Sequence, residues 1–328
     1  MSIKVLHQGL LTTIQDLGRY GFQKFGVIVG GAMDSYSLRL GNLLVGNIEN
    51  EAALEITLYG TKLQFEEDTL IAITGANFLP TINDKPAPLW SPIIVRKNSV
   101  LKFHTAIDGS RAYIAIAGGI DIPEVMGSKS TYLRANIGGF KGRALQKGDV
   151  LPLTSSKVFN SKTSKIRQKN KGNWSINYNE LINLGNHQII RVIQGTEFDR
   201  FDKESQHKLL TEVFTLSLQS DRMGYRLEGS SLSLSENFEL LSEGVTFGTI
   251  QIPPSGQPII LMADRQTTGG YPKIGQVISA DLPTLAQLPP KATIQFKLVT
   301  LEEAEQAFIQ NEQKIHLIKK AINFKLYP

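Results

Sequence analysis

Short apolar segments, each closed by a turn residue, recur along the chain. They are "DTLIAITGA", "SVLKFHTA", "RAYIAIAGG", "QIIRVIQG", "FTLSLQSDR", "QPIILMADR" and "ATIQFKLV". Each segment alternates apolar with polar residues or is fully apolar, and Gly, Pro, Asp or Asn bounds it, which is the pattern of β-strands. Because regular helices do not separate them, antiparallel barrels or sandwiches are favoured. We therefore expect a mainly β protein.

Some of these segments recur at a nearly constant separation. "IKVLHQG" resembles "IIRVIQG", and pairing Ile3 with Ile190 gives an offset of 187 residues. With one residue inserted, "EITLYGT" aligns with "EGVTFGT", which pairs Gly60 with Gly248. Repeats at a fixed offset indicate duplicated units, so we expect two β-barrel domains of one topology. The expected boundaries are 1–105 for the first barrel, 106–187 for a connecting segment, 188–300 for the second barrel and 301–328 for a C-terminal helix.

Two helices are expected between and after these strands. Asp34 can cap a short helix that follows "GGAMD", and the leucines of "SLRLGNLL" give that helix an apolar side. Near the C-terminus, Thr300 and Glu303 form a capping box before "LEEAEQAFIQNEQKIHLIKKAI". The sequence therefore predicts a short helix after Asp34 and a second helix at the C-terminal end.

Composition excludes several classes of protein. The 328 residues are 41% hydrophobic and include no cysteine, so a substantial core can form, whereas disulfides and thiolate chemistry are not available. No apolar run reaches the length of a membrane span, and the N-terminus lacks the apolar core of a signal peptide. We expect a cytoplasmic protein without a membrane partner.

The net charge of +5 is partly concentrated in residues 155–173, "SSKVFNSKTSKIRQKNKGN". A nucleic-acid surface would carry aromatic residues among these charges, and only Phe159 is present. A solvated, flexible linker is the favoured interpretation, and nucleic acid is not an expected partner.

Common catalytic motifs are absent. The chain has no GxxxxGK[ST] phosphate loop, no GxGxxG after a strand and no GxSxG elbow. Its five histidines are scattered without metal-binding spacing, so no metal site is expected. The sequence does not describe a self-sufficient hydrolase.

Four segments carry more polar side chains than turns require. They are "GVIVGGAMDSYS" (26–37), "GSKSTYLRANIGGFKGRAL" (127–145), "SDRMGYRLEG" (220–229) and "ADRQTTGGYPKIG" (263–275). An Asp-Arg pair follows an apolar strand in the last two, at strand ends where sites on rigid scaffolds are built. Arg offers a planar fork to an oxyanion or a polarised carbonyl, and Asp accepts from N–H or orients the Arg. A purely structural Asp–Arg pair is the alternative for each segment.

The candidate residues follow from these segments. The candidate catalytic residues are Asp264, Arg265, Lys273, Asp221 and Arg222. The candidate substrate-binding residues are Gln266, Thr267, Thr268, Tyr271, Tyr225, Met33, Asp34, Tyr132, Arg134 and Arg143. We expect the 263–275 segment to line the main pocket of the second domain, with the other loops facing it. Gly269 and Gly270 are expected to turn the chain sharply and expose N–H donors.

The same four segments resemble a known family. "GGAMDSYSLRLGNLLVGN", "STYLRANIGGFKGRALQKGD", "SDRMGYRLEG" and "PPSGQPIILMADRQTTGGYPKIGQVISADLP" are similar to its signatures over nearly the whole chain. This family is called the 5-oxoprolinase C subunit, KipA-like, allophanate hydrolase subunit 2, or biotin-dependent carboxyltransferase family. One departure is Ile28, where the family usually carries proline.

The resemblance implies a cyclophilin-like β-barrel fold and three alternative functions. The first is the C subunit of an ATP-dependent 5-oxoprolinase, a hydrolase that opens 5-oxoproline to glutamate. Its partners in that complex would be a KipI-like B subunit together with a LamB/YcsF-like A subunit. The second is a carboxyltransferase half acting on urea or a similar small amide, with biotin supplied by another chain. The third is a regulator that antagonises a KipI-like kinase inhibitor. ATP is implied only for the complex, and the chain alone is expected to be inactive.

Overall fold

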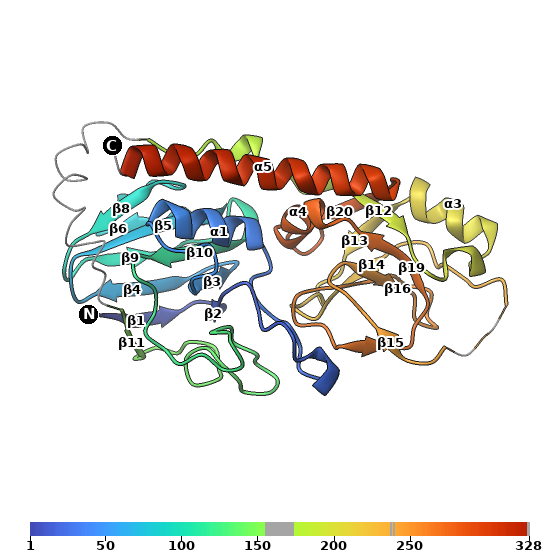
Figure 1. Cartoon of the computed structure of the whole chain (residues 1–328), viewed down its shortest axis with the longest axis horizontal. Coiled ribbons are helices and arrows are strands. Elements are labelled where there is room, and N and C mark those ends of the chain that lie inside the picture. Colours follow the sequence, from blue (N-terminus) through green and yellow to red (C-terminus); the bar gives the residue numbers. More distant parts are fainter. Residues whose placement is uncertain (155–173, 237, 239, 327–328) are drawn as a thin grey trace. The chain divides into compact units, whose positions relative to one another are not determined.

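The computed structural model describes residues 1–154, 174–236, 238 and 240–326. The chain divides into two compact units (Figure 1). Unit 1 comprises Met1–Arg19, Asp34–Leu184 and Lys314–Pro328, and unit 2 comprises Tyr20–Met33 and Gly185–Gln313. The basic segment at 155–173, which we expected to be a linker, lies outside the described residues.

Unit 1 contains two antiparallel sheets. The six-stranded sheet has the order β11-β1-β4-β9-β6-β7 and consists of β1 (Ser2–Gln8), β4 (Thr61–Phe65), β6 (Thr81–Ile82), β7 (Lys85–Pro86), β9 (Val100–Lys102) and β11 (Val150–Pro152). The five-stranded sheet has the order β2-β3-β10-β5-β8 and consists of β2 (Leu11–Gln15), β3 (Ala53–Thr57), β5 (Thr69–Asn77), β8 (Pro92–Val95) and β10 (Asp108–Ile116). The segment expected to connect two domains, 106–187, instead supplies β10 and β11 to these sheets.

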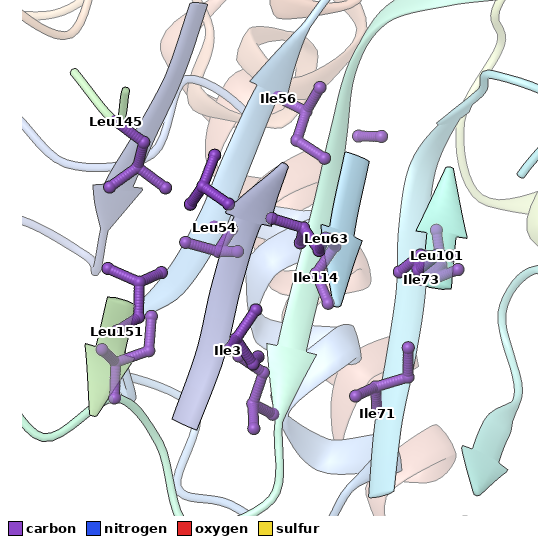
Figure 2. Packing of buried hydrophobic residues seen from close by; sticks show 14 of the residues in the cluster. Ile3, Leu54, Ile56, Leu63, Ile71, Ile73, Leu101, Ile114, Leu145 and Leu151 are labelled. Carbon is purple, nitrogen blue, oxygen red and sulfur yellow. The ribbon is translucent and has the colours of Figure 1, made fainter. Parts of the chain in front are cut away.

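The main core of unit 1 combines side chains from both sheets. Ile3 of β1 and Leu63 of β4 belong to the same buried cluster as Leu54 of β3 and Ile114 of β10, and all four are fully buried (Figure 2). Along β1 every second residue of the first four is buried, which is the period of a strand with one face on a core. The alternation of apolar and polar residues in this segment therefore reflects the packing of one face of the sheet on the core.

The other face of the five-stranded sheet is also covered. Helix α1 (Ser35–Leu44) packs on β5 and β10, so these two strands are buried on both faces, and each contains an apolar run, 70–73 in β5 and 112–116 in β10. Asp34 caps α1, as predicted, by accepting hydrogen bonds from the backbone N–H and the hydroxyl of Ser37 at 2.9 and 2.6 Å. Leu40 and Leu44 of α1 share a second cluster with Ile315 of the C-terminal helix.

Unit 2 is a closed barrel of seven strands in the order β12-β19-β16-β17-β14-β13-β20. Its strands are β12 (His187–Gln194), β13 (Val213–Leu216), β14 (Gly224–Glu228), β16 (Thr249–Gln251), β17 (Ile259–Leu261), β19 (Lys273–Val277) and β20 (Thr293–Leu298). A separate two-stranded ribbon pairs β15 (Glu243–Gly244) with β18 (Thr268–Gly269). Unit 2 also contains the short helices α3 (Lys203–Thr211) and α4 (Leu282–Ala286). Its 3-10 helices are η1 (Gln23–Phe25), η3 (Phe198–Arg200) and η4 (Ser279–Asp281). The remaining 3-10 helix, η2 (Tyr178–Glu180), belongs to unit 1. The prediction of a mainly β protein with a barrel is confirmed.

The expected repeat holds locally but not in the strand pairing. Gly60 and Gly248 both have positive φ, 91° and 88°, and each directly precedes a strand, β4 or β16. However, β1 pairs antiparallel with β4 and β11, whereas β12 pairs antiparallel with β19 and parallel with β20. The two units therefore do not share one topology. Similarity over a few residues indicates the positions of turns and the buried face of a strand. Which strands pair with each other depends on contacts between residues distant in the sequence.

Helix α5 (Leu301–Leu326) ends the chain, as predicted. The capping box is present: the hydroxyl of Thr300 accepts from the N–H of Glu303 at 3.2 Å, and the Glu303 carboxylate accepts from the N–H of Thr300 at 2.8 Å. Within the described ranges, no helix is both long and apolar enough to cross a membrane.

Candidate functional site

The two Asp-Arg segments meet at one end of the barrel in unit 2. Strand β14 pairs antiparallel with β17, with Gly224 opposite Leu261, so the residues just before β14 lie beside those just after β17. The backbone N–H of Asp264 donates to the carbonyl of Arg222 at 2.8 Å. The strand register thus explains why two segments 42 residues apart in sequence join in one site.

Arg222 and Asp264 form a buried ion pair at this junction. Arg222 donates through Nε to Oδ2 and through Nη2 to Oδ1 of Asp264, both at 2.8 Å, and the two side chains are 6% and 7% exposed. Nη2 also donates to the carbonyl of Gly31 at 2.6 Å. The pair therefore fastens the 20–33 stretch of unit 2 to the end of the barrel, and the carboxylate of Asp264 is largely committed to its guanidinium partner.

Arg265 lies next to this pair but does not join it. Its side chain is buried, with the residue 8% exposed, and Nε donates to the carbonyl of Val245 at the long distance of 3.4 Å. No other hydrogen bond or ion pair of this guanidinium occurs among the residues that the structure describes. Burial lowers the pKa of Arg265, and the nearby Tyr20 and Asp264 act only partly against it. Among the described residues, the site thus contains one buried cation without a close counterion.

Lys273 occupies a different position, held between two carboxylates. Nζ lies 3.0 Å from Oε2 of Glu243 and 3.3 Å from Oε2 of Glu197, and the Lys273 backbone N–H also donates to Glu197 at 2.8 Å. Burial acts to lower the pKa of Lys273, but the two glutamates outweigh it and the pKa lies above the ordinary value. Lys273 is therefore a charged lysine in an ion-pair cluster, and it connects the ribbon residue Glu243 to the barrel.

The remaining residues of the 263–275 segment are divided between the ribbon and the surface. Thr268 and Gly269 form strand β18, the carbonyl of Thr267 accepts from Val245, and Gln266 is exposed. Neither Gly269 nor Gly270 has positive φ, so the backbone there does not use the conformational freedom of glycine. A Cβ at Gly269 would lie 2.5 Å from Nε2 of Gln251, so a larger residue there would displace the end of that side chain.

A hollow of about 550 Å³ adjoins the far part of the same segment. It is lined by Ser231, Leu232, Ser233, Leu234, Phe238, Leu240, Ile252, Pro253, Pro254, Gly256, Gly270, Tyr271 and Pro272. Tyr271 is therefore the one member of our candidate list that lines it, and Asp264, Arg265 and Lys273 do not.

Four further candidates have structural contacts. Asp221 is exposed and accepts through Oδ1 from the N–H groups of Met223 and Gly224, so it shapes the turn before β14. Tyr225 and Met33 belong to the buried core cluster of unit 2. Asp34 begins α1 in unit 1. For these residues, packing or capping accounts for the side-chain types.

The 127–145 loop of unit 1 contains the last three candidates. Tyr132 pairs through its backbone with Ile137, and Arg134 is exposed. Arg143 donates through Nη1 and Nη2 to the two carboxylate oxygens of Asp149, both at 2.7 Å. This bidentate pair stabilises the end of the loop.

The loop is fastened by a carboxylate that we did not single out. Asp16, which is buried, accepts from the hydroxyls of Ser128 and Ser130 and from the N–H of Lys129. The loop also needs a glycine at 142, where φ is 67° and a Cβ would lie 2.1 Å from the carbonyl oxygen of Asn136. Several glycines and hydroxyls of this segment are thus explained by its internal packing.

The Arg143–Asp149 pair gives stability that depends on pH. The hydrogen bonds from Arg143 hold the pKa of Asp149 below its ordinary value of 3.8. A carboxylate with a lowered pKa in the folded state stabilises that state above its unfolded pKa and loses this effect as the pH falls through the folded pKa. Asp149→Asn should therefore cost about 1 kcal/mol at neutral pH. The cost should shrink below the ordinary pKa in denaturant titrations run at a series of pH values, and a constant difference would contradict the assignment.

Sequence reasoning missed Glu197 and Glu243, the partners of Lys273. Glu197 directly follows the segment "QGT" at the end of β12, so an acid at a strand end was the available signal. Burial acts to raise the pKa of Glu197, but hydrogen bonds from Thr196 and Lys273 outweigh it, and the pKa lies below the ordinary value. Glu197 therefore carries its charge beside the lysine.

Comparison with known proteins agrees with the resemblance seen in the signatures. The sequence profile of the carboxyltransferase domain, subdomain A and B, matches residues 25–298. The chain belongs to this carboxyltransferase domain family. The match spans the barrel of unit 2 and most of the sheets of unit 1.

Two bacterial proteins match this chain nearly end to end. The chain is 40% identical to the 5-oxoprolinase C subunit of Haemophilus influenzae over 323 residues, which are 98% of this chain and 99% of the relative. It is 42% identical to the 5-oxoprolinase C subunit of Escherichia coli over 305 residues, 93% of this chain and 94% of the relative.

Longer proteins contain a similar region. Urea amidolyase of Saccharomyces cerevisiae is 32% identical over 327 residues, which are 92% of this chain but 17% of that protein. The crystal structure of Kluyveromyces lactis urea carboxylase superposes with a TM-score of 0.87 at 31% identity, covering 97% of this chain and 29% of that one. The chain thus corresponds to a small part of these larger proteins.

Proposed function

We propose that the chain is the C subunit of an ATP-dependent 5-oxoprolinase, a hydrolase complex that opens 5-oxoproline to glutamate. The observation that carries the proposal is the match of 40–42% identity over 99% and 94% of two relatives that bear this subunit name. The alignment covers nearly the full length of this chain and of these relatives, whereas it covers only 17% of the length of urea amidolyase. The proposed partners are a LamB/YcsF-like A subunit plus a KipI-like B subunit, and the cytoplasm is the proposed compartment.

The polar groups of unit 2 suit a supporting role in such a complex. Arg265 offers a buried cation to a substrate oxyanion or to a polarised carbonyl. Among the described residues of this site, Arg222, Asp264 and Lys273 are held in ion pairs, and none of them provides a nucleophile beside a general base. The partner proteins are therefore needed to complete the catalytic groups.

The charged groups of this site do not fit a triphosphate. Lys273 is neutralised by two glutamates and Arg222 by Asp264, which leaves Arg265 as the one buried cation among the site's described residues without a close counterion. The sequence also contains no phosphate loop. We assign ATP to the complex rather than to these residues, and we derive no step of this chain through it.

A carboxyltransferase role is the second candidate. The superposition on Kluyveromyces lactis urea carboxylase with a TM-score of 0.87 favours it. In that role the substrate would be urea or a similar small amide, and biotin would come from another chain.

Reconstitution tests these functions. The purified chain is combined with its two proposed partner proteins, and glutamate formed from 5-oxoproline is measured with and without ATP. We expect turnover only when all three proteins and ATP are present, because the described residues of the site do not form a complete catalytic set. Turnover by the chain alone would contradict the proposed division of labour. Transfer of CO2 to urea in the presence of a biotin carboxylase and biotin carrier, without glutamate formation, would favour the second candidate.

A further inference from the structure

One cation of the site, Arg265, has no close negative partner among the described residues. Arg222 uses both oxygens of Asp264, and Lys273 lies between Glu197 and Glu243. Arg265 has a single long hydrogen bond to a carbonyl among the described residues, although it is 8% exposed. A buried charge is costly unless a counter-charge compensates it, so a conformation that keeps Arg265 buried favours the binding of an anion.

The anchoring of Arg265 limits how it can bind. Its backbone N–H donates to the carbonyl of Met262, directly after strand β17, so the barrel wall fixes its Cα. Nε is directed to Val245, which lies next to the ribbon. The two terminal nitrogens have no hydrogen bond within the described ranges. Two adjacent terminal N–H groups in one plane match the two oxygens of a carboxylate.

We propose that Arg265 binds the carboxylate of the substrate, while Arg222 and Asp264, which neutralise each other, do not contact it. This inference rests on the proposed function, because 5-oxoproline carries a carboxylate in addition to its lactam. Urea and other neutral amides carry none. Arg265 would therefore make the site selective for anionic amides over neutral ones.

The test compares matched pairs of small molecules in direct binding. Saturation-transfer NMR and calorimetry measure the affinity of the assembled complex, and of the chain alone, for 5-oxoproline and for 2-pyrrolidinone, the same lactam without the carboxylate. We expect the acid to bind at least about ten-fold more tightly, as for a charge-assisted contact. Arg265→Gln should abolish this preference, and Arg265→Lys should retain part of it. The exposed Arg226 provides the control, since Arg226→Gln should leave the preference intact.

A second pair separates this inference from the proposed function. Ureidoacetate and methylurea share a ureido group and differ in a carboxylate. If reconstitution gives no 5-oxoprolinase activity but ureidoacetate still binds more tightly than methylurea in an Arg265-dependent manner, the carboxylate assignment stands and the lactam substrate is wrong.

Three results would overturn the assignment. The first is that the acid and the neutral molecule bind with equal affinity in both pairs. The second is that a folded Arg265→Gln variant keeps the preference for the acid. The third is that inorganic phosphate displaces the acids at a concentration lower than that of the acids. The last result would identify Arg265 as a phosphate contact. Failure of every acid to bind at millimolar concentration to both the chain and the complex would count against it equally. A melting curve for each variant verifies that it is folded.

Discussion

Replacing Arg222 by methionine should lower the free energy of unfolding by about 3–5 kcal/mol, the cost of leaving a buried carboxylate without its cation. Asp264 is 7% exposed in its side chain and receives two hydrogen bonds from Arg222, so water cannot replace the guanidinium. The loss should also free the carbonyl of Gly31 from its 2.6 Å contact. Urea denaturation of the purified chain measures the effect.

Two variants serve as controls for this prediction. Arg226→Met removes an exposed arginine from strand β14 and should change the free energy of unfolding by less than about 0.5 kcal/mol. The double variant Arg222→Met, Asp264→Leu removes both charges and should recover most of the loss, because hydrophobic replacement of a buried pair is often neutral. A loss below about 1 kcal/mol for Arg222→Met would mean that the pair is not buried in solution.

Replacing Lys273 by methionine should lower the free energy of unfolding by about 3 kcal/mol. The reason is Glu197, whose side chain is 9% exposed and whose charge would lose the ammonium 3.3 Å away. The second partner, Glu243, has a side chain that is 55% exposed, so water can solvate it in the variant. Thermal and denaturant unfolding measure the loss, and the double variant Lys273→Met, Glu197→Gln should regain most of it.

The same lysine provides an internal control. Glu243→Gln breaks the other ion pair of Lys273, but because this pair is exposed it should cost less than about 1 kcal/mol. If Lys273 were instead a catalytic group, Lys273→Met would abolish activity of the assembled complex without a loss of stability. That result would contradict the structural role inferred from the two glutamates.

The sequence predicted the local elements well because their signals are local. Asp34 and the Thr300 capping box begin helices where a side-chain oxygen precedes an apolar periodic run. The apolar runs around Ile71 and Ile114 form strands because both faces are covered and no polar alternation interrupts them. The Asp-Arg pair at 264–265 follows a strand end as expected. These features depend on a few neighbouring residues.

Features that depend on distant contacts could not be predicted in this way. The similarity of Ile3 to Ile190 correctly indicates two strands, but their neighbours differ. Strand β12 pairs in parallel with β20, which closes its barrel, whereas β1 pairs antiparallel with β4 and β11. Likewise the sequence gives no reason for Asp264 to pair with Arg222 rather than with its own neighbour Arg265. That choice follows from the register of β14 and β17.

By itself, then, the sequence determined the strands, the helix caps, the family signatures and the polar segments that make up the candidate site. Tertiary structure decided which of those polar residues are neutralised and which are available. Two arginines and one lysine of similar sequence context become a paired arginine, an arginine without a close counterion among the described residues and a lysine between two carboxylates. The physical reason is that the energy of a buried charge depends on the charges brought within a few ångströms of it, and strand register sets those distances.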